Sequence, residues 1–531
     1  MSASDTMVTM SVDGREVRVP TGVSVAAALL STGVSAFRMS VNGSERGPLC
    51  GMGVCYECRV SIHDVAHRRA CLVMVADGLR VSTHDKQVLP FGCAQGRHSA
   101  QHDRHDVVVI GAGPAGIAAA TRAAECGRGV LLLDESADVG GKIWRGRADV
   151  EAKGSARRWV ARLERSGTTV VRGASVVDVL PRAQGGFTVR GEQAAGALLV
   201  DADMIVLATG ARERFLPFPG WTLPGVIGVG AAQALLKSGA SFSGKRVVIA
   251  GSGPLLLPVA SALQADGAMV RLVAEQAATR DVARYAAGLV RHPATLVQAA
   301  RYRIGFAGTP YALGTWVSAA RGDGRVEEVD VTNGRASRTI ACDVLCAAFG
   351  LVPNTELARL LGCDVVGGTG VVNGDQQTSR DGVYCVGEPT GIGGVELSLA
   401  EGEIAGLCCA GRHADARALH PRREMLRRDA AAMGRAFALR PALSTLASAD
   451  TIVCRCEDVT LGAICTSRTM RQAKLYTRAG MGACQGRICG AALEFLLGWE
   501  PDTTRLPVAP ALFSTLIADP APSAPPAHQG A

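Results

Sequence analysis

Hydrophobic and polar residues alternate along the first part of the chain. Residues 7–20 read Met-Val-Thr-Met-Ser-Val-Asp-Gly-Arg-Glu-Val-Arg-Val-Pro, and the alternation breaks at Asp13-Gly14. This alternation predicts two strands, and the Asp-Gly pair predicts a hairpin turn of the primed type between them. The apolar run Val23–Ser31 that follows predicts a short helix.

Further along, short apolar runs lead directly into glycine-rich turns. Val107–Ile110 precedes the first of these turns, Met204–Leu207 precedes the second, and residues 245–250 precede the third. A strand that enters a glycine turn and then a helix predicts α/β units on a parallel sheet. The charged stretch His413–Arg435 predicts a helical linker.

Composition narrows the class of protein. Hydrophobic residues make up 48% of the chain and charged residues 20%, which suits packed cores, while 64 glycines suit tight turns and nucleotide-binding loops. The net charge of +8 is spread along the chain and aromatic residues are only 4%, which disfavours nucleic-acid binding.

The sequence predicts neither a membrane span nor a signal peptide. No segment reaches about 18 uninterrupted apolar residues, and the apolar run at Val23–Leu30 has no basic region before it. We therefore expect a cytoplasmic protein, with attachment to the inner face of the membrane left open.

Eight of the 17 cysteines fall into two groups, and the first has the spacing C-x4-C-x2-C followed by C-x12-C. That spacing is typical of plant-type [2Fe–2S] sites, in which most ligands come from one loop. Gly51 and Gly53 allow the loop conformations that side chains disfavour. A zinc site is the alternative, although zinc sites prefer two C-x2-C pairs. The candidate ligands are Cys50, Cys55, Cys58 and Cys71.

The second group has the pattern C-x-C, 27 residues, then C-x4-C. Four thiolates on two loops can hold a small metal centre, and C-x-C is unusual for zinc, so a second [2Fe–2S] cluster is favoured over structural zinc. Residues 457–483 are expected to supply helices between the two loops. The candidate ligands are Cys454, Cys456, Cys484 and Cys489.

The remaining nine cysteines are scattered, and we expect them to be small buried hydrophobic residues. The middle of the chain has no C-x-x-C or C-x4-C pair, so disulfide-reductase chemistry is not predicted. The scattered cysteines are Cys93, Cys126, Cys342, Cys346, Cys363, Cys385, Cys408, Cys409 and Cys465.

The first glycine turn is a dinucleotide-binding motif in its proper setting. It reads G-x-G-x-x-G between a strand and an Ala-rich helix, with acidic residues about 20 positions later. The glycines let a pyrophosphate approach the helix N-terminus. Asp134 is expected to bind the ribose hydroxyls, with Glu135 as the second choice. The loop residues of the candidate site are Gly111, Gly113, Pro114, Ala115 and Gly116.

Three later segments resemble those of flavoproteins with two dinucleotide folds and predict FAD as the nucleotide. One is the Gly-Gly turn, one is an Ala-Thr-Gly strand end, and one ends in Gly-Glu where such proteins usually have an Asp. The helix that follows residues 391–394 would direct its positive end at the flavin. The candidate residues are Gly140, Gly141, Lys142, Thr209, Gly210, Gly387 and Glu388.

A second strand-turn-helix begins at Lys245 and contains Gly251 and Gly253, but Leu256 stands at the third glycine position. A bulky residue there should push the helix off the strand and spoil the pyrophosphate seat. Ala274 occupies the position of the ribose-binding acid, with Glu275 next to it. We expect the fold to remain and NAD(P)H binding to be lost.

The order of these motifs resembles the alpha, or electron-transfer, subunits of hydrogen cyanide synthase, opine oxidase, hydroxyproline dehydrogenase and heterotetrameric sarcosine oxidase. The matching segments are Leu49–Leu72, Val107–Asp134, Ala208–Gly230, Gly251–Val259, Val383–Gly406 and Cys454–Gly490. Those subunits share Gly-Ser-Gly-Pro-Leu-Leu-Leu-Pro, so Leu256 does not depart from them. Some relatives carry the ferredoxin-like part as a separate polypeptide.

The resemblance implies a two-dinucleotide-fold α/β flavoprotein with a β-grasp ferredoxin-like domain and a helical domain like bacterioferritin-associated ferredoxin. It implies FAD, two [2Fe–2S] clusters and a partner beta subunit with its own FAD, where an amino, imino or opine substrate is oxidised before electrons pass to an external acceptor. Some relatives also hold FMN between subunits. A self-contained NAD(P)H-dependent reductase and a redox-sensing protein without turnover are the alternatives. No catalytic residue is assigned.

The expected domains are ferredoxin-like at 1–98, FAD-binding at 104–240 and 341–412, an inserted NAD(P)-like domain at 241–340, a helical linker at 413–450, a second cluster domain at 451–500 and a Pro/Ala-rich tail at 501–531. In this tail, Arg505, Pro507 and Pro510 are candidates for docking on a partner, and disorder is expected after Asp519.

Overall fold

The computed structural model describes residues 6–83, 101–145, 154–193, 196–500 and 504–518. The chain forms two compact units, each assembled from separate stretches of sequence. Unit 1 comprises residues 1–90, 211–352 and 427–503, and unit 2 comprises residues 91–210, 353–426 and 504–531.

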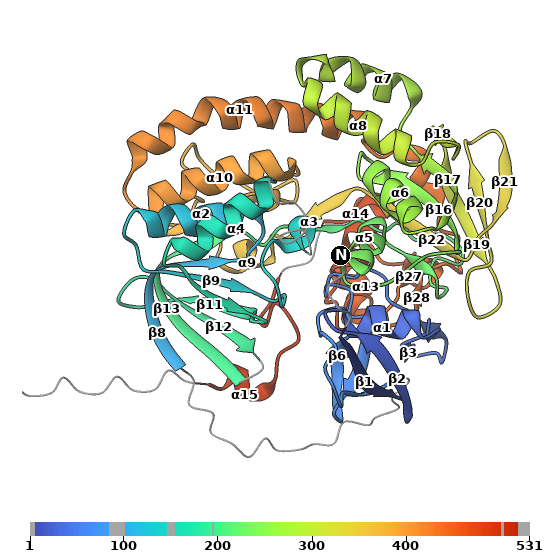
Figure 1. Cartoon of the computed structure of the whole chain (residues 1–531), viewed down its shortest axis with the longest axis horizontal. Coiled ribbons are helices and arrows are strands. Elements are labelled where there is room, and N and C mark those ends of the chain that lie inside the picture. Colours follow the sequence, from blue (N-terminus) through green and yellow to red (C-terminus); the bar gives the residue numbers. More distant parts are fainter. Residues whose placement is uncertain (1–5, 84–100, 146–153, 194–195, 501–503, 519–531) are drawn as a thin grey trace, which may run out of the picture. The chain divides into compact units, whose positions relative to one another are not determined.

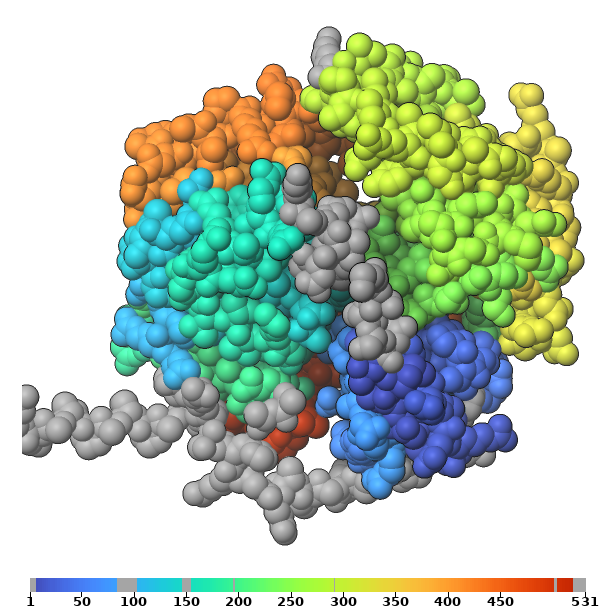
Figure 2. All heavy atoms as spheres, in the orientation of Figure 1, coloured from blue at the N-terminus to red at the C-terminus, as the bar shows by residue number. Residues whose placement is uncertain are grey.

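Unit 1 begins with a five-stranded sheet in the order β2-β1-β7-β5-β6, the blue segment in Figures 1 and 2. The predicted hairpin is confirmed, because β1 and β2 pair antiparallel and the turn residues Asp13 and Gly14 both have positive φ angles, 49° and 82°. The predicted helix is also confirmed, with Ser24 capping its first turn. The elements are β1 Met7–Val12, β2 Arg15–Pro20, α1 Val25–Ser31, β3 Arg38–Met39, β4 Glu45–Arg46, β5 Arg59–Ile62, β6 Val65–Arg69 and β7 Arg80–Ser82.

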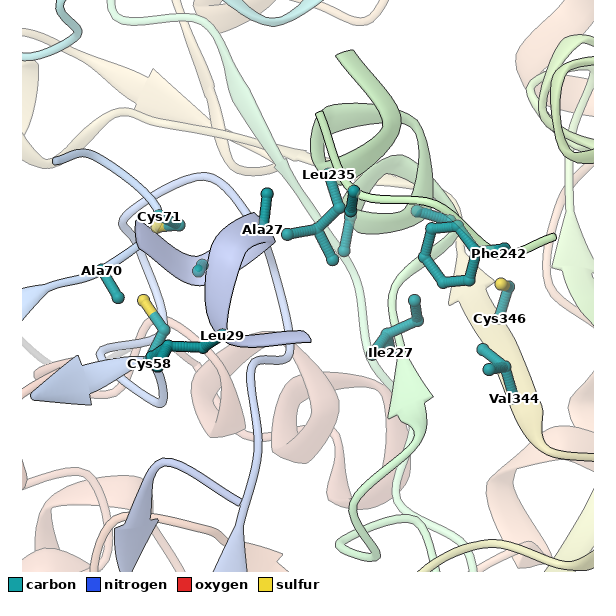
Figure 3. Close-up of a cluster of buried hydrophobic side chains, with 14 of the residues drawn as sticks. Ala27, Leu29, Cys58, Ala70, Cys71, Ile227, Leu235, Phe242, Val344 and Cys346 are labelled. Atoms are coloured by element: carbon teal, nitrogen blue, oxygen red, sulfur yellow. The ribbon is translucent and has the colours of Figure 1, made fainter. Parts of the chain in front are cut away.

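The first helix joins this small domain to the middle of unit 1. Ala27 and Leu29 of α1 are fully buried, and they belong to one hydrophobic core with Leu235 and Phe242 from the middle segment. Figure 3 shows this core, with Cys58 and Cys71 on the ferredoxin-like side of it. The first cysteine group therefore sits in the packed interior of unit 1.

The middle of unit 1 is a parallel α/β sheet in the order β15-β22-β16-β17-β18. A separate three-stranded antiparallel sheet, β19-β20-β21, follows it in yellow in Figure 1. The elements are β15 Val226–Ile227, α5 Val229–Lys237, β16 Arg246–Ser252, α6 Leu256–Ala265, β17 Met269–Glu275, α7 Thr279–Gly288, α8 Pro293–Gly305, β18 Tyr311–Leu313, β19 Trp316–Arg321, β20 Glu328–Thr332, β21 Ser337–Ala341 and β22 Val344–Phe349.

The last part of unit 1 is small and mostly helical. A two-stranded ribbon carries the C-x-C pair, and helices fill the interval before the second pair, as the sequence predicts. Its elements are β27 Ile452–Cys454, β28 Val459–Thr460, α12 Leu461–Ile464, α13 Met470–Thr477 and α14 Cys489–Leu497.

Unit 2 is built on a seven-stranded sheet in the order β10-β9-β8-β13-β12-β11, with β26 pairing β13. Helices α2 and α10 pack closely because Gly402 and Gly406 face α2: a Cβ on either would lie 2.2 or 2.4 Å from a backbone oxygen of α2. The elements are β8 Gln101–Ile110, α2 Pro114–Glu125, β9 Val130–Asp134, α3 Gly141–Trp144, α4 Ser155–Arg165, β10 Thr169–Arg172, β11 Ser175–Pro181, β12 Phe187–Gln193, β13 Gly196–Leu207, β26 Val383–Cys385 and α10 Gly394–Cys409.

The helix predicted for His413–Arg435 is present as α11 (His413–Ala436), and its first half belongs to unit 2. Part of the predicted tail is ordered on unit 2: Val508 N–H bonds the carbonyl of Val177, and Arg190 bonds the carbonyl of Leu516 in α15 (Phe513–Leu516) at 2.8 Å. Residues 504–518 thus pack on their own chain, while the disorder expected after Asp519 lies outside the described residues.

The prediction that all scattered cysteines are buried is wrong for two of them. Cys465 is exposed and Cys126 is half-buried, because one follows the short helix α12 and the other ends α2 at the surface. Cys93 lies outside the described residues. None of the helices in the described part of the chain combines the length and the apolar character needed to cross a membrane.

Candidate functional site

The structure brings the four cysteines of the first group together in a buried loop. Cys50, Cys55, Cys58 and Cys71 are each at most 4% exposed. Gly51 and Gly53 have φ angles of 59° and 78°, in the region that side chains rarely adopt, so the loop can turn tightly around its own centre.

Backbone N–H groups of this loop point at sulfur. Cys50 Sγ accepts from the N–H groups of Met52 and Cys55, both at 3.4 Å, and Cys55 Sγ accepts from Glu57 N–H at 3.4 Å. A hydrogen bond from the Cys55 thiol and these N–H groups lower the pKa of Cys50 to about 6. The loop therefore favours thiolate at Cys50, which is the form that binds metal.

The second group also converges. Cys456 Sγ lies 3.5 Å from Cys484 Sγ, and a hydrogen bond from Cys489 lowers the pKa of Cys454. Gly480 N–H donates to Cys454 Sγ at 3.5 Å. The four thiols therefore form two neighbouring pairs, Cys454 with Cys489 and Cys456 with Cys484. Each pair joins the two loops that the sequence predicts.

Both sites fit a binuclear centre. In the first, Cys50 pairs with Cys55 and Cys58 hydrogen-bonds Cys71, so each site offers two thiol pairs. Two sulfurs on one tetrahedral metal with bonds of about 2.3 Å lie roughly 3.8 Å apart, close to the 3.5 Å between Cys456 and Cys484. Two pairs match the two irons of a [2Fe–2S] cluster.

A buried ion-pair network connects the two cysteine sites. Glu57 lies between ligand candidates of the first group, and Arg455 lies between Cys454 and Cys456 of the second. Arg455 contacts Glu57 at 3.2 Å, Arg38 contacts Glu57 at 2.8 Å, and Arg38 also donates to the Arg455 carbonyl at 3.3 Å. Two side chains thus span the distance between the two loops.

A second buried ion pair lies next to this network, and the two together are called the junction below. Arg46 contacts Asp458 at 2.7 Å, with side chains 3% and 0% exposed, and Asn42 N–H donates to the same carboxylate at 3.1 Å. Trp221 lies over Arg455, 5.0 Å from ring centre to guanidinium carbon, and its ring N–H bonds the Ile452 carbonyl at 2.6 Å. The ferredoxin-like domain, the middle segment and the C-terminal helices therefore meet around Arg455.

The buried side chains of the junction carry a net positive charge, which suits negatively charged metal clusters in the two cysteine sites. Burial disfavours the charge on Glu57, but Arg455 and Arg38 outweigh it and lower the pKa of Glu57. The buried arginines Arg38, Arg46 and Arg455 outnumber the carboxylates of Glu57 and Asp458. A [2Fe–2S] cluster with four thiolates carries a charge of about −2, so a surplus of buried positive charge offsets part of it. In the sequence only Glu57, Arg455 and Asp458 stand near cysteines, and nothing there indicated that Arg38 and Arg46 would meet them.

In unit 2 the predicted glycine loop lies at the end of β8, as expected. A Cβ on Gly116 would lie 1.8 Å from the Gly111 carbonyl oxygen, whereas a Cβ on Gly113 would meet nothing within 4 Å. Gly116 is therefore needed for helix-to-strand packing, while open space over Gly113 remains for a ligand. Pro114 begins α2 and Ala115 packs beneath Gly387, whose Cβ would come within 2.8 Å of it.

Asp134 holds the glycine loop with both carboxylate oxygens. Ala112 N–H donates to one oxygen at 2.6 Å and Ser136 N–H to the other at 2.7 Å. Burial raises the pKa of Asp134. Glu135, the next residue, is only half-buried. The structure thus gives Asp134 a loop-fixing role and leaves Glu135 nearer to solvent.

The other predicted flavin-site residues gather around the same loop. A Cβ on Gly141 would lie 2.9 Å from Gly113 Cα, which places the Gly-Gly turn and half-buried Lys142 beside it. Glu388 accepts from Gly394 N–H at 2.9 Å, so its carboxylate caps α10. The position of the second flavin motif is fixed in turn by Glu401, which binds Gly387 N–H at 2.8 Å.

The Ala-Thr-Gly strand end is tied to the start of the segment after residue 352. Thr209 Oγ1 donates to the Asn354 carbonyl at 2.6 Å, and the Asn354 side chain returns a bond to the Thr209 carbonyl at 2.9 Å. Gly210 has a φ of 69° and accepts from Asn354 N–H. These residues fix the crossover between the two stretches of unit 2.

The second dinucleotide fold keeps its sheet but differs at the helix start. Helix α2 begins one residue after Gly113, whereas α6 begins three residues after Gly253, at buried Leu256. Residues 254 and 255 form a tighter turn before this helix, in which Leu256 N–H donates to the Gly253 carbonyl at 3.2 Å and Leu257 N–H to the Pro254 carbonyl at 3.3 Å.

The strand end of this second fold is covered by the chain itself. Ser252 Oγ donates to the Phe437 carbonyl at 2.8 Å. Fully buried Gln276 donates to the Ala438 carbonyl at 3.1 Å and accepts from Arg440 N–H at 3.2 Å. Glu275, like Asp134, binds the loop N–H groups of Gly253 and Ala277, both at 2.8 Å. The segment after α11 thus lies over the strand end at which a dinucleotide fold binds the ribose of its cofactor.

A family model described as pyridine nucleotide-disulphide oxidoreductase matches residues 105–402. The chain belongs to this family. A second model, described as a 2Fe-2S iron-sulfur cluster binding domain, matches residues 5–86 and includes the first cysteine group. This member of the family is an FAD-dependent oxidoreductase with an N-terminal [2Fe–2S] ferredoxin-like domain.

Within the family, the chain groups with alpha-type subunits. Hydrogen cyanide synthase subunit HcnB of Pseudomonas aeruginosa is 34% identical over 421 residues, which cover 72% of this chain and 90% of the relative. An opine oxidase subunit of Rhizobium meliloti is 31% identical over 447 residues, which cover 75% and 82%. The predicted membership of the HcnB, opine oxidase and sarcosine oxidase alpha group is confirmed.

A solved structure shares the fold over nearly the whole length. L-proline dehydrogenase from P. horikoshii superposes with a TM-score of 0.72, covering 98% of this chain and 99% of that one, at 22% identity. The predicted flavoprotein fold with an N-terminal ferredoxin-like domain is thereby confirmed for this family member.

Proposed function

We propose that this chain is the electron-transfer subunit of a multi-subunit dehydrogenase or oxidase that acts on an amino, imino or opine substrate. It would hold one FAD in unit 2 and two [2Fe–2S] clusters in unit 1, the second in a domain like bacterioferritin-associated ferredoxin. The observation that carries the proposal is the pair of four-thiol sites joined by Glu57 and Arg455.

The bound groups would supply the redox chemistry, since FAD takes up electron pairs and each [2Fe–2S] cluster carries one electron. The chain's own residues bind and orient these groups. The eight cysteines of the two groups would ligate iron, and the N–H groups around Cys50 would stabilise negative charge on sulfur. The arginine network would keep the two centres at a fixed separation in a dry interior.

In unit 2 we assign the ribose contact of FAD to Glu135 and a loop-holding role to Asp134. The support is that both oxygens of Asp134 already accept backbone N–H groups. The space over Gly113 would receive the pyrophosphate at the N-terminus of α2. Gly141, Lys142, Thr209, Gly210 and Gly387 would surround the rest of the cofactor, with Glu388 capping α10 beneath it.

The expected partner is a beta subunit with its own FAD, at which the substrate is oxidised. This expectation is supported by the relatives of the chain, which are themselves subunits of hydrogen cyanide synthase and opine oxidase. An external acceptor would receive the electrons. FMN at a subunit interface stays a prediction from the family resemblance.

A self-contained NAD(P)H-dependent reductase is the second candidate, and the retained parallel sheet of unit 1 favours it. The buried bonds from Ser252 and Gln276 to residues 437–440 count against it, because a nicotinamide cofactor would have to displace that segment.

Anaerobic purification of the full chain tests the proposal. We expect about four irons and four sulfides per FAD, slow oxidation of amino acids by the chain alone, and turnover after addition of the beta subunit encoded with it. Stopped-flow mixing with NADPH should leave the flavin oxidised. Zinc in place of iron, or rapid bleaching by NADPH, would overturn the assignment.

A further inference from the structure

Outside the flavin and cysteine sites, a cluster of metal-binding side chains stands in unit 2. It joins Asp375, in the loop before β26, to Cys408 of α10 and His413 at the start of α11. One ligand atom from each of these three residues lies within 4.8 Å of the other two. The cluster uses none of the eight cysteines assigned to iron.

Asp375 is the centre of the cluster. His413 Nδ1 lies 3.1 Å from one carboxylate oxygen, and His420 Nε2 lies 3.4 Å from the other. Cys408 hydrogen-bonds the same carboxylate. His413 and His420 are seven residues apart on α11, so they share one face of the helix.

These separations match a tetrahedral ion. Ligand atoms bound to Zn²⁺ at about 2.0 to 2.3 Å lie roughly 3.3 to 3.8 Å from one another. The 3.1 Å between His413 Nδ1 and one oxygen of Asp375 is close to that edge length, whereas His420, whose Nε2 lies 3.4 Å from the other oxygen, is not one of the three residues whose ligand atoms converge. His420 Nε2 is buried, makes no hydrogen bond among the described residues and faces the second oxygen of the Asp375 carboxylate.

The loop that carries Asp375 is held in place independently of any ion. Asn373 Oδ1 accepts from Asp375 N–H at 2.9 Å. Arg423, three residues after His420 on the same helix, donates to the Gly374 carbonyl at 2.6 Å and to Gln376 Oε1 at 3.2 Å. The backbone therefore presents Asp375 to the histidines without needing the metal to order the loop.

We propose that Asp375, Cys408 and His413 bind a zinc ion, with His420 beside the second carboxylate oxygen of Asp375. One carboxylate oxygen, one thiolate and one imidazole nitrogen are a donor set that zinc accepts, and a water molecule would complete the four ligands. The ion would tie α10, α11 and the loop before β26 together. Because β26 leads into Gly387 and Glu388, the site would stabilise the flavin-binding half of the chain.

Metal analysis of the full chain tests this site. Iron-loaded protein is treated with a mild chelator, dialysed against ZnSO₄ and assayed for zinc, iron and FAD together. We expect one zinc per chain with unchanged iron, and a higher midpoint of thermal FAD release when zinc is present. His413→Ala and Cys408→Ala should each weaken zinc binding at least tenfold and abolish the zinc-dependent shift, with iron and FAD retained.

Two matched variants serve as controls. Cys409→Ala removes the neighbouring buried thiol, and His292→Ala removes a histidine that lies 3.3 Å from Asp429 in unit 1. Both should bind zinc like the wild type. If Cys408→Ala fails to fold, half-exposed His413 still decides the question. Zinc binding unchanged by His413→Ala, or zinc found only in chains that lack iron, would overturn the proposal.

Discussion

Arg455 lies 3.2 Å from Glu57, although 398 positions separate them in the sequence. Each residue is flanked by cysteines of its own group, and both side chains are at most 2% exposed. Their contact means that the ferredoxin-like domain and the C-terminal helices share one interior, in which a charged link lies beside a common hydrophobic core.

Loss of this link should destabilise unit 1. Arg38→Met leaves Glu57 with one arginine instead of two, and breaking a buried ion pair costs about 3 kcal/mol. We expect thermal unfolding, followed by cluster absorbance, at a clearly lower temperature, and weaker magnetic interaction between the two reduced clusters in electron paramagnetic resonance. Arg80→Met breaks an exposed pair with Asp64 and should change little. Equal stability of the two variants would argue against a structural link.

The second cysteine site should be sensitive to a single methyl group. A Cβ on Gly482 would lie 2.1 Å from Cys456 Cβ, whereas a Cβ on Gly490 meets nothing within 4 Å. Gly482→Ala is therefore expected to lower iron from about four to about two per chain, and Gly490→Ala to keep it. Iron and sulfide assays check this, and full iron in Gly482→Ala would contradict the assignment of Cys456 as a ligand.

Two glycines of the flavin loop should respond differently to alanine. Gly113→Ala meets no protein atom, so we expect a folded chain whose FAD affinity falls at least tenfold, about 1.4 kcal/mol, because the methyl group occupies the pyrophosphate space. Gly116→Ala collides with the Gly111 carbonyl and should destabilise the fold itself. Equilibrium FAD titration and circular dichroism separate the two effects, with Gly434→Ala as the control. Normal FAD affinity in Gly113→Ala would place the pyrophosphate elsewhere.

The stability of unit 1 should fall as pH rises from about 4.5 to 7. Burial raises the pKa of Glu275 from 4.5 to about 7, so the folded state holds a proton that the unfolded state releases across this range. The loss can reach about 3 kcal/mol by pH 7 and is absent below pH 4.5. Glu275→Gln should flatten this part of the urea-unfolding profile, while exposed Glu327→Gln should not. An unchanged slope in Glu275→Gln would show that other groups dominate.

Much of the site was encoded locally. The spacing of the cysteines predicted which thiols meet, because Cys50, Cys55 and Cys58 share one short loop and the second group stands in two closely spaced pairs. The glycine loop at 111–116 could also be predicted from the sequence, because its strand, turn and helix follow one another directly along the chain. Leu256 at the third glycine position predicts that NAD(P)H binding is lost, and this stays a prediction.

Other features were decided only by tertiary packing. The pairing of Arg38 with Glu57 and Arg455, the cover that residues 437–440 place over Gln276, and the meeting of Asp375 with Cys408 and His413 all join distant segments. The structure also gave Asp134 a role that the sequence did not predict, because its carboxylate accepts the N–H groups of Ala112 and Ser136. Sequence spacing fixes geometry only within one loop or helix, whereas the partner of a buried charge depends on which surfaces the folded chain brings together.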